Sequence, residues 1–245
     1  MQLTPDMELV EGMPIAYVKS LKALVFSDLH LGYEGQMAKK GVFVPKVNLK
    51  KIIEHIAQAA TGRDVERLII VGDIKNDFSK VDTEEFNELY ELISFAKQGK
   101  FALVLIKGNH DNFVDRYKEP FKLEIHTQSV QMGEYFFFHG EETPRIPDEG
   151  VTTLIMGHEH PAISITNKAG RRDKLKCFLY GKYKKKDLLV LPAMNFFAGG
   201  TEMNVHSPSL LSPVLTGPTV RAMRGIAIGY GSTEDFGKIS ELVGL

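Results

Sequence analysis

Side chains that bind metal ions follow five separate apolar runs of this sequence. Each run is rich in Val, Ile, Leu or Phe and is followed by one or more Asp, Asn or His residues. These residues are Asp28 and His30; Asp73; Asn109, His110 and Asp111; His139; and His158 and His160. Carboxylate, amide and imidazole groups form a donor set that suits Mn, Fe or Zn better than a soft thiolate site does. The only cysteine, Cys177, lies outside all five runs. The pattern predicts a binuclear metal site.

The apolar runs themselves predict the elements that position these side chains. Short runs with little polar alternation are typical of strands buried on both faces in an α/β sheet. In open α/β sheets, ligands collect beyond the carboxyl ends of the strands, where loops bring distant residues into one crevice. Because every candidate ligand follows such a run, we expect all of them to meet at one edge of the fold.

The first half of the chain predicts alternating strands and helices. A hairpin over Glu8 to Val18, turning at Glu11-Gly12, precedes strands at 23–27, 68–71 and 101–106. One helix is expected from Asn48, as its N-cap, to about residue 60. A second is expected from Asp82, in a capping arrangement with Glu85, to about residue 98. This β-α-β-α-β order favours parallel pairing, since each crossover has room for a helix.

From residue 121 onward, short apolar segments separated by turn residues predict mostly strands. The expected strands are 122–126, 135–139, 153–156, 162–166, 175–180, 187–191 and 225–230. The proline- and serine-rich stretch 205–218 predicts an irregular segment. We expect a single domain over 1–245, with residues 205–245 packing over the sheet edge.

Composition limits the class of protein. A chain of 245 residues with 43% apolar content can bury a continuous core, and its net charge of -1 gives no global attraction to nucleic acid or membrane. The first twenty residues contain no apolar stretch typical of a secretory signal, and no run approaches the length of a membrane span. A single cysteine favours a reducing compartment, so we expect the cytoplasm.

The motifs D-x-H, G-D, G-N-H-D, H-G and G-H-x-H, in that order from Asp28 to His160, resemble the calcineurin-like metallophosphoesterase superfamily. Any one motif alone would be a weak signal, but the set is specific in residue type, order and strand context. The resemblance implies a four-layer α/β/β/α sandwich, an α/β fold in which two mixed sheets are flanked by helices. It also implies that the metals lie at one edge.

The resemblance further implies a ligand set for two divalent metal ions. One ion would be held by Asp28, His30, Asp73 and His160, and the other by Asp73, Asn109, His139 and His158. Asp73 would bridge the ions, and a bridging hydroxide would be the nucleophile. Mn is favoured, with Fe, Zn and Ni as alternatives.

His110 differs from the other four histidines of the motifs, because the family pattern leaves it off the metals and near the leaving-group oxygen. It is the candidate general acid, with Asp111 assigned to the catalytic set beside it. A partner must orient its ring, and Asp111, Asp77 and Asn76 are the candidates. Here the sequence departs from a common version of the pattern, which has an aspartate at the position of Asn76. An amide orients an imidazole less strongly than a carboxylate.

Two further segments resemble a narrower branch. The D-L-H-L-G-Y opening and the Leu191–Asn204 segment look like DNA ligase-associated and related archaeal or bacterial phosphoesterases. This resemblance implies phosphodiester cleavage in DNA or RNA, with DNA-repair proteins as candidate partners. Within the second segment, Gly199 and Gly200 would permit a tight backbone approach behind the metal loops.

A concentrated basic region breaks the near-neutral balance of the chain. It comprises Lys168, Arg171, Arg172, Lys174, Lys176, Lys182 and Lys184 to Lys186, with Asp173 as its single internal acid. Lysines that protect strand edges are the simpler interpretation. Contact with a polyanionic substrate is the alternative. Arg145 is interpreted as a surface residue, with a bidentate phosphate contact as the alternative. Glu159 is expected to face solvent or to support the ligands, and Tyr33 either packs in its loop or stacks on a base.

The sequence therefore predicts a metal-dependent phosphoesterase that cleaves phosphodiesters in the manner of a nuclease. A phosphomonoesterase or small-molecule phosphodiesterase is the first alternative, because the same metal pair serves both. A non-catalytic nucleic-acid-binding subunit with the same fold is the second alternative. Such subunits usually lose ligands, whereas this chain lacks none of those expected.

Overall fold

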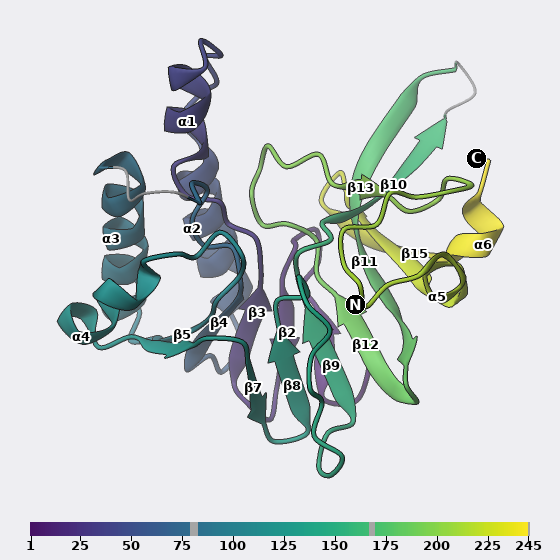
Figure 1. The fold of residues 1–245 in the computed structure, drawn as a ribbon, viewed down its shortest axis with the longest axis horizontal. Helices are drawn as coiled ribbons and strands as arrows, with labels where there is room; N and C mark the ends of the chain where they lie inside the picture. The colour runs from purple at the N-terminus through teal and green to yellow at the C-terminus, as the bar shows by residue number, and fades with distance from the viewer. Residues whose placement is uncertain (79–82, 167–169, 245) are drawn as a thin grey trace.

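The computed structural model describes residues 1–78, 83–166 and 170–244. Its first sheet has six strands in the order β1-β2-β3-β4-β5-β6 (Figure 1). These are β1 Met7–Leu9, β2 Ala16–Val18, β3 Ala23–Phe26, β4 Arg67–Val71, β5 Ala102–Ile106 and β6 Glu124–His126. The first two strands form the predicted hairpin, and β3 to β6 run parallel. The carboxyl ends of β3, β4 and β5 therefore lie at the same edge.

The second sheet has nine strands, in the order β13-β10-β11-β12-β9-β8-β7, with β14 pairing with β11 and β15 pairing with β14. They are β7 Ser129–Met132, β8 Tyr135–Phe138, β9 Thr153–Met156, β10 Pro161–Thr166, β11 Arg172–Tyr183, β12 Lys186–Val190, β13 Thr201–Glu202, β14 Arg224–Gly229 and β15 Ser232–Lys238. Strand β9 is parallel to both β8 and β12. The carboxyl ends of β8 and β9 thus also coincide.

Alternation along each strand divides the apolar side chains among three cores. On β3, Ala23 and Val25 face the second sheet, in a core that also contains Phe137 and Phe178. The intervening Leu24 and Phe26 face the helices. The outer face of the second sheet forms a third core, which includes Leu154 and Leu188. Burial on both faces explains why these strands read as continuous apolar runs.

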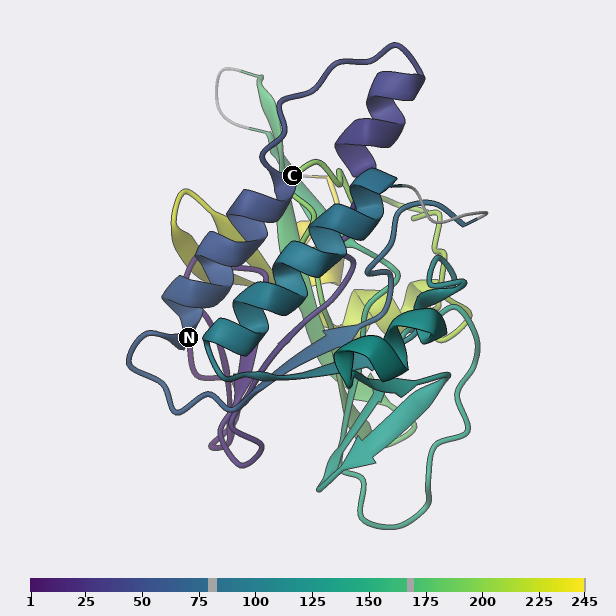
Figure 2. The same cartoon turned by 90° about the vertical axis from the view of Figure 1, so that its left-hand side faces the viewer.

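Helices cover the two outer faces. Helices α2 Asn48–Ala60 and α3 Thr83–Gln98 pack on the first sheet, and α5 Gly217–Ala222 and α6 Ile239–Leu242 pack on the second (Figures 1 and 2). The remaining helices are α1 Tyr33–Lys39, the 3₁₀ turn Val114–Tyr117 and α4 Lys118–Phe121. This is the expected four-layer α/β/β/α order with two mixed sheets. Within the residues described, no helix is long and apolar enough to cross a bilayer.

Most expected elements are confirmed to within a few residues, and the differences are local. Asn48 is the first residue of α2 and not its cap; its amide donates to the Leu29 carbonyl and accepts from Phe196 N–H. Asp82, the predicted cap of the second helix, lies outside the described residues. Strands β7, β13 and β15, helices α1, α4, α5 and α6, and the 3₁₀ turn were not predicted, because each is short or carries mixed polar and apolar residues.

Candidate metal centre

Five strand ends supply the side chains of the candidate site. Strands β3, β4 and β5 of the first sheet lead into Asp28 and His30, Asp73, and Asn109 with His110 and Asp111. Strands β8 and β9 of the second sheet lead into His139, and His158 with His160. Met194 N–H donates to the Ser27 carbonyl at 2.9 Å, so the 193–195 loop that follows β12 binds the end of β3. The side chains meet at the seam between the two sheets.

One cluster joins Asp28, His30 and His160, whose donor atoms all lie within 4.8 Å of one another. His160 Nε2 lies 3.2 Å from Asp28 Oδ1, and His30 Nε2 lies 3.3 Å from His160 Nε2. Asp28 is fully buried, and its Oδ2 accepts from the Ser27 hydroxyl at 2.6 Å. These contacts fix the carboxylate toward the two imidazoles.

A second cluster joins Asp73, His139 and His158 within the same separation. His139 Nε2 lies 3.3 Å from Asp73 Oδ2 and 3.2 Å from His158 Nδ1. The His139 Nδ1–H donates to the Val71 carbonyl at 3.1 Å, and because a carbonyl only accepts, Nε2 is left to face the cluster. Asp73 Oδ2 also lies 4.0 Å from His30 Nε2, so this carboxylate connects the two clusters.

A left-handed backbone conformation directs several of these side chains toward the site. Five non-glycine residues of the site have positive φ, from 46° to 67°: Asp28, His30, Asp73, His158 and His160. Non-glycine residues adopt this conformation rarely, and it concentrates where a site constrains the backbone. The D-L-H and H-E-H turns share one pattern, in which the outer residues face the site and the middle residue, Leu29 or Glu159, is buried.

Three glycines of the G-D, G-N-H-D and G-H-x-H motifs, to which no separate role was assigned from the sequence, make room for the cluster. A Cβ at Gly72 would lie 2.0 Å from His139 Nδ1, one at Gly108 would lie 2.2 Å from Asp73 Oδ1, and one at Gly157 would lie 2.8 Å from Asp28 Oδ2. Each precedes a candidate ligand directly in the sequence. That repeated position, a glycine immediately before the ligand, was the available signal.

The donor atoms suit a bound cation. Asn109 Oδ1 is buried without a hydrogen-bond partner among the described residues, although an amide oxygen normally finds one. In the two clusters carboxylate oxygens and imidazole nitrogens converge, and these are the ligands that Mn, Fe and Zn accept. A third group of close donor atoms joins His30, Asp73 and His110. His110 therefore lies beside the candidate ligands.

The pKa values of three histidines in the two clusters depend on the charge of their neighbours. Burial and the neighbouring His160 lower the pKa of His30 to about 4, and burial and His139 lower that of His158 to about 4. Although burial opposes it, the hydrogen bond and charge of Asp73 raise the pKa of His139 to about 10. A cation that bound His139 Nε2 would compete with a proton for that nitrogen.

The orienting partner of His110 is a main-chain carbonyl. Its Nδ1–H donates to the Asn76 carbonyl at 2.8 Å, whereas the Asn76 amide donates to Gln36 Oε1. Asp111 is not that partner: its oxygens accept from Lys75 N–H at 3.1 Å and Gly108 N–H at 2.9 Å. Burial and then the charge of Asp73 raise the Asp111 pKa to about 7. The His110 ring also packs on Phe78, with a centroid separation of 3.6 Å.

Glu159 supports the ligands and does not face solvent. Its buried carboxylate accepts from Leu211 N–H at 3.0 Å and Ser212 N–H at 2.9 Å. The Ser212 hydroxyl in turn donates to the Gly140 carbonyl at 2.6 Å. The 211–212 segment thus holds together the two loops that carry His139 and His158.

Three smaller expectations are also resolved. Tyr33 packs against protein, since its ring stacks on Phe197 with centroids 5.6 Å apart. A Cβ at Gly200 would lie 2.2 Å from the His160 carbonyl, as the expected close approach requires. At Gly199 the nearest atom, Lys174 Nζ, would be 4.0 Å away, so the expected close approach there is wrong.

The basic region is not one surface. Its described members sit toward both ends of β11, whose 12 residues span roughly 35 Å at about 3.3 Å per residue, and Lys168 lies outside the described residues. In the first half of β11, Arg172 pairs with Glu202, and Lys176 Nζ donates to the Ala193 carbonyl at 2.8 Å and to the Asn195 carbonyl. These two basic groups therefore already have partners within the protein.

Comparisons with known proteins bear on the family and the fold of the chain. The sequence model for calcineurin-like phosphoesterases matches residues 21–144, a segment that ends before His158 and His160. Among curated protein sequences, none matches the chain. The chain is similar in structure to nuclease MPE of Pseudomonas putida, with a TM-score of 0.62, 20% identity and 93% of each chain covered. It is also similar to YfcE, a phosphoesterase from E. coli, with a TM-score of 0.41, 17% identity, and 86% of this chain and 95% of that chain covered.

Proposed function

The chain belongs to the calcineurin-like phosphoesterase family, a family of metal-dependent hydrolases of phosphate esters, and we propose that it hydrolyses phosphodiester bonds of nucleic acid with a pair of divalent ions. One observation carries the proposal: five strand ends from two sheets bring their donor atoms together around Asp73. Core packing does not require that convergence, whereas a two-ion site does.

The ligand assignment follows the two clusters. Asp28, His30 and His160 would hold one ion, and His139 and His158 the other, with Asp73 shared between them. Asn109 is added to the second ion from the family resemblance, and its buried Oδ1 lacks a hydrogen-bond partner among the described residues. When bound, such ions lower the pKa of coordinated water and polarise the phosphoryl oxygens. The chain itself contributes the fixed backbone, and Mn is the ion we favour, with Fe, Zn and Ni as alternatives.

His110 is the proposed general acid. Because its Nδ1 is committed to the Asn76 carbonyl, Nε2 is the nitrogen that can carry a proton toward the site, where it lies 3.8 Å from Asp73 Oδ2. A proton held there can pass to a leaving oxygen. A carbonyl stabilises the protonated ring less than a carboxylate would, so this acid is weakly supported by its partner. Asp111 contributes by holding the Lys75 and Gly108 amides, and thereby the two loops beside His110.

The preference for nucleic acid is supported by the likeness in fold to a nuclease. The likeness of the Leu191–Asn204 segment to DNA ligase-associated phosphoesterases points the same way. We further propose a cytoplasmic enzyme, since a single cysteine suits a reducing compartment. DNA-repair proteins are the corresponding candidate partners.

A metal-reconstitution panel tests the proposal. Chelated protein would be reloaded with Mn, Fe, Zn or Ni and assayed on a bis-aryl phosphodiester, an aryl phosphomonoester, and labelled DNA and RNA. We expect metal-dependent turnover of the diester and of at least one nucleic acid, and at least a hundredfold loss in Asp73→Asn. Faster turnover of the monoester would favour a phosphomonoesterase, and binding of nucleic acid without turnover by any loaded form would favour a non-catalytic subunit.

A further inference from the structure

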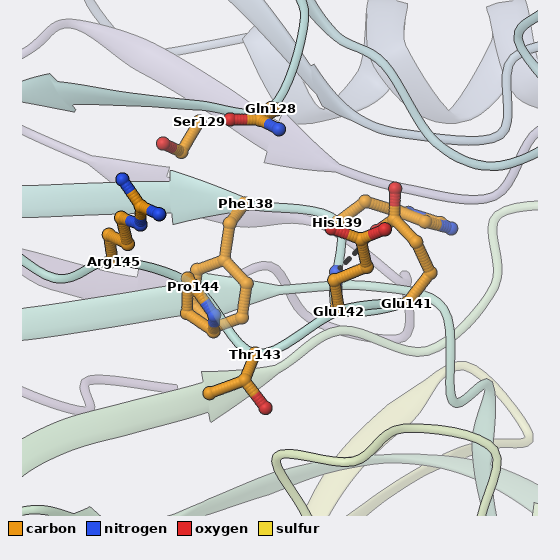
Figure 3. A pocket seen from close by; sticks show the side chains of 10 residues that line it. Gln128, Ser129, Phe138, His139, Glu141, Glu142, Thr143, Pro144 and Arg145 are labelled. Atoms are coloured by element: carbon orange, nitrogen blue, oxygen red, sulfur yellow. Dashed lines mark hydrogen bonds between the residues drawn. The ribbon is translucent and has the colours of Figure 1, made fainter.

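A hollow of about 460 Å³ adjoins the candidate metal centre (Figure 3). It lies between the start of β7 and the loop that leaves β8, and His139 is one of its lining residues. The lining residues are Gln128, Ser129, Phe138, His139, Gly140, Glu141, Glu142, Thr143, Pro144 and Arg145. A volume of this size is typical of small-molecule sites and accommodates a nucleotide unit.

The loop that forms the wall of this hollow is fixed where it leaves the metal centre. Gly140 N–H donates to Glu141 Oε2 at 3.1 Å, and the Gly140 carbonyl accepts the Ser212 hydroxyl at 2.6 Å. His139, one residue earlier, lies 3.3 Å from Asp73. The position of the hollow is therefore tied to the position of the candidate ligands.

Charge is distributed unequally along the hollow. In Figure 3, Glu141 and Glu142 lie beside His139, whereas Arg145 lies on the other side of Phe138, next to Ser129. The end nearest the candidate metals thus offers carboxylate acceptors, and the far end offers a guanidinium that can bind a phosphate bidentately. A bound group must match both ends.

The polar side chains of the hollow are available for a ligand. Among the described residues, none forms a side-chain hydrogen bond or ion pair with Arg145, Gln128, Thr143 or Glu142. By contrast, Arg171, Arg172 and Arg224 are all paired with carboxylates. An unpaired guanidinium that lines a hollow sharing His139 with the candidate metal centre is placed to contact a bound ligand.

From this distribution of charge we infer that the hollow binds the nucleotide next to the scissile phosphate. Its sugar hydroxyl and base amino groups would donate to Glu141 and Glu142, and the following phosphate would bind Arg145. The two carboxylates also disfavour a dianionic phosphomonoester relative to a monoanionic diester. This inference rests on the proposed function and adds the substrate's second point of contact.

Arg145→Ala tests the inference by substrate length. Kinetics of the metal-loaded enzyme would be compared on a hexanucleotide and on a bis-aryl phosphodiester, which has no second phosphate. We expect KM for the hexanucleotide to rise roughly tenfold with kcat changed less than about twofold, because a charge-assisted contact made before and during reaction is lost. The salt dependence of 1/KM should weaken by about 0.7 in log-log slope.

The controls separate a local contact from a general loss of charge. Arg145→Lys should raise KM less than Arg145→Ala does, since lysine keeps the positive charge but cannot bind a phosphate bidentately. Arg221→Ala removes an equal charge from a guanidinium that donates to the His206 carbonyl and lines no part of this hollow, so it should leave both substrates unaffected.

The failures are distinguishable. An equal effect of Arg145→Ala on both substrates, or no effect on either, would overturn the inference and leave the proposed phosphodiesterase intact. Turnover of the bis-aryl ester with none of the hexanucleotide would overturn both the inference and the proposed preference for nucleic acid, and would leave a metal-dependent phosphodiesterase. Absence of turnover on any ester with every metal would overturn the proposed function, and the inference with it.

Discussion

At the scale of single residues, the site depends on atoms that are fixed by main-chain partners. His110 and His139 each donate Nδ1–H to a carbonyl, of Asn76 and Val71, so that Nε2 faces the cluster in both. Two histidines of the same type nevertheless have different proposed roles. His139 lies against Asp73 at 3.3 Å, and His110 lies farther off at 3.8 Å.

His110→Ala should therefore affect substrates according to their leaving group. We expect kcat for an alkyl or nucleotide leaving group to fall by roughly 10² to 10⁴, because such alkoxides need a proton, whereas an aryl leaving group needs little assistance. Steady-state kinetics on matched diesters would measure the difference. Equal losses on both classes would contradict a general-acid role.

Sequence alone predicted side chains that the structure brings close together, but it did not predict the groups that hold them in place. Asp28, Asp73 and His139 were predictable because an apolar run followed by a ligand is a local pattern. The carbonyl that orients His110 was not, since every residue carries a carbonyl and only the fold selects one. Glu159 was misjudged in part for the same reason: its partners, the amides of Leu211 and Ser212, lie more than fifty residues away.

At the scale of elements, the parallel pairing of the first half of the chain was predictable, and the strands of mixed composition were not. The parallel β3, β4 and β5 were predictable from the β-α-β-α-β alternation. Strand β15 was not, because Ser232–Lys238 mixes charged and apolar residues and pairs at the margin of the sheet. At the seam, the ends of strands from the two sheets lie close together. The glycines that precede the ligands leave room for that close approach.

Gly108→Ala tests the close approach between the loop after β5 and Asp73. Gly108 has an ordinary φ, so the substitution adds only a Cβ, which would lie 2.2 Å from Asp73 Oδ1. We expect a loss of about 1–3 kcal/mol in stability and weaker metal binding. Denaturant unfolding and metal titration would measure both. Gly217→Ala is the control, since nothing lies within 4 Å of its added Cβ, and an equal effect there would argue against crowding at the site.

Helix α3 carries a pH-dependent contact behind the D-L-H turn. Glu88 accepts from Gly32 N–H at 2.8 Å, and burial, with the nearby charges of Glu34 and Glu84, raises the pKa of Glu88 to about 7. A carboxyl with a raised folded pKa stabilises the fold when protonated. That stability is present below pH 4.5 and is lost as pH rises through about 7.

Glu88→Gln mimics the protonated carboxyl and should therefore remove the loss of stability at high pH. After allowance for solvent screening, we expect its Tm at pH 8 to exceed that of the unsubstituted protein by about 2–4 °C, and the two to agree near pH 4.5. Melting curves across this range would show it. Glu91→Gln, at an exposed position on the same helix, is the control and should show no pH-dependent difference. A constant offset at every pH would contradict the assignment.

At the scale of the whole molecule, the site joins two sheets that otherwise meet through an apolar core. Asp28, Asp73 and Asn109 come from the first sheet, and His139 and His160 from the second. Ions that bind all of them would connect the two sheets. Metal binding and the stability of the whole fold would therefore depend on the same donor atoms.

Thermal unfolding should reveal this link. With Mn at about 100 times its Kd, binding to the folded state stabilises it by about 2.7 kcal/mol per site, or roughly 5–10 °C in a chain of this size. Calorimetry with and without Mn would measure the shift, and Asp73→Asn should remove most of it. An unchanged Tm across the Mn series would indicate that no ion binds the folded site.

The most direct test of the central claim is anomalous diffraction from crystals of the Mn-loaded protein. The account predicts two peaks, one beside Asp28, His30 and His160 and the other beside Asn109, His139 and His158, with Asp73 in contact with both. A single peak, or peaks away from Asp73, would contradict it.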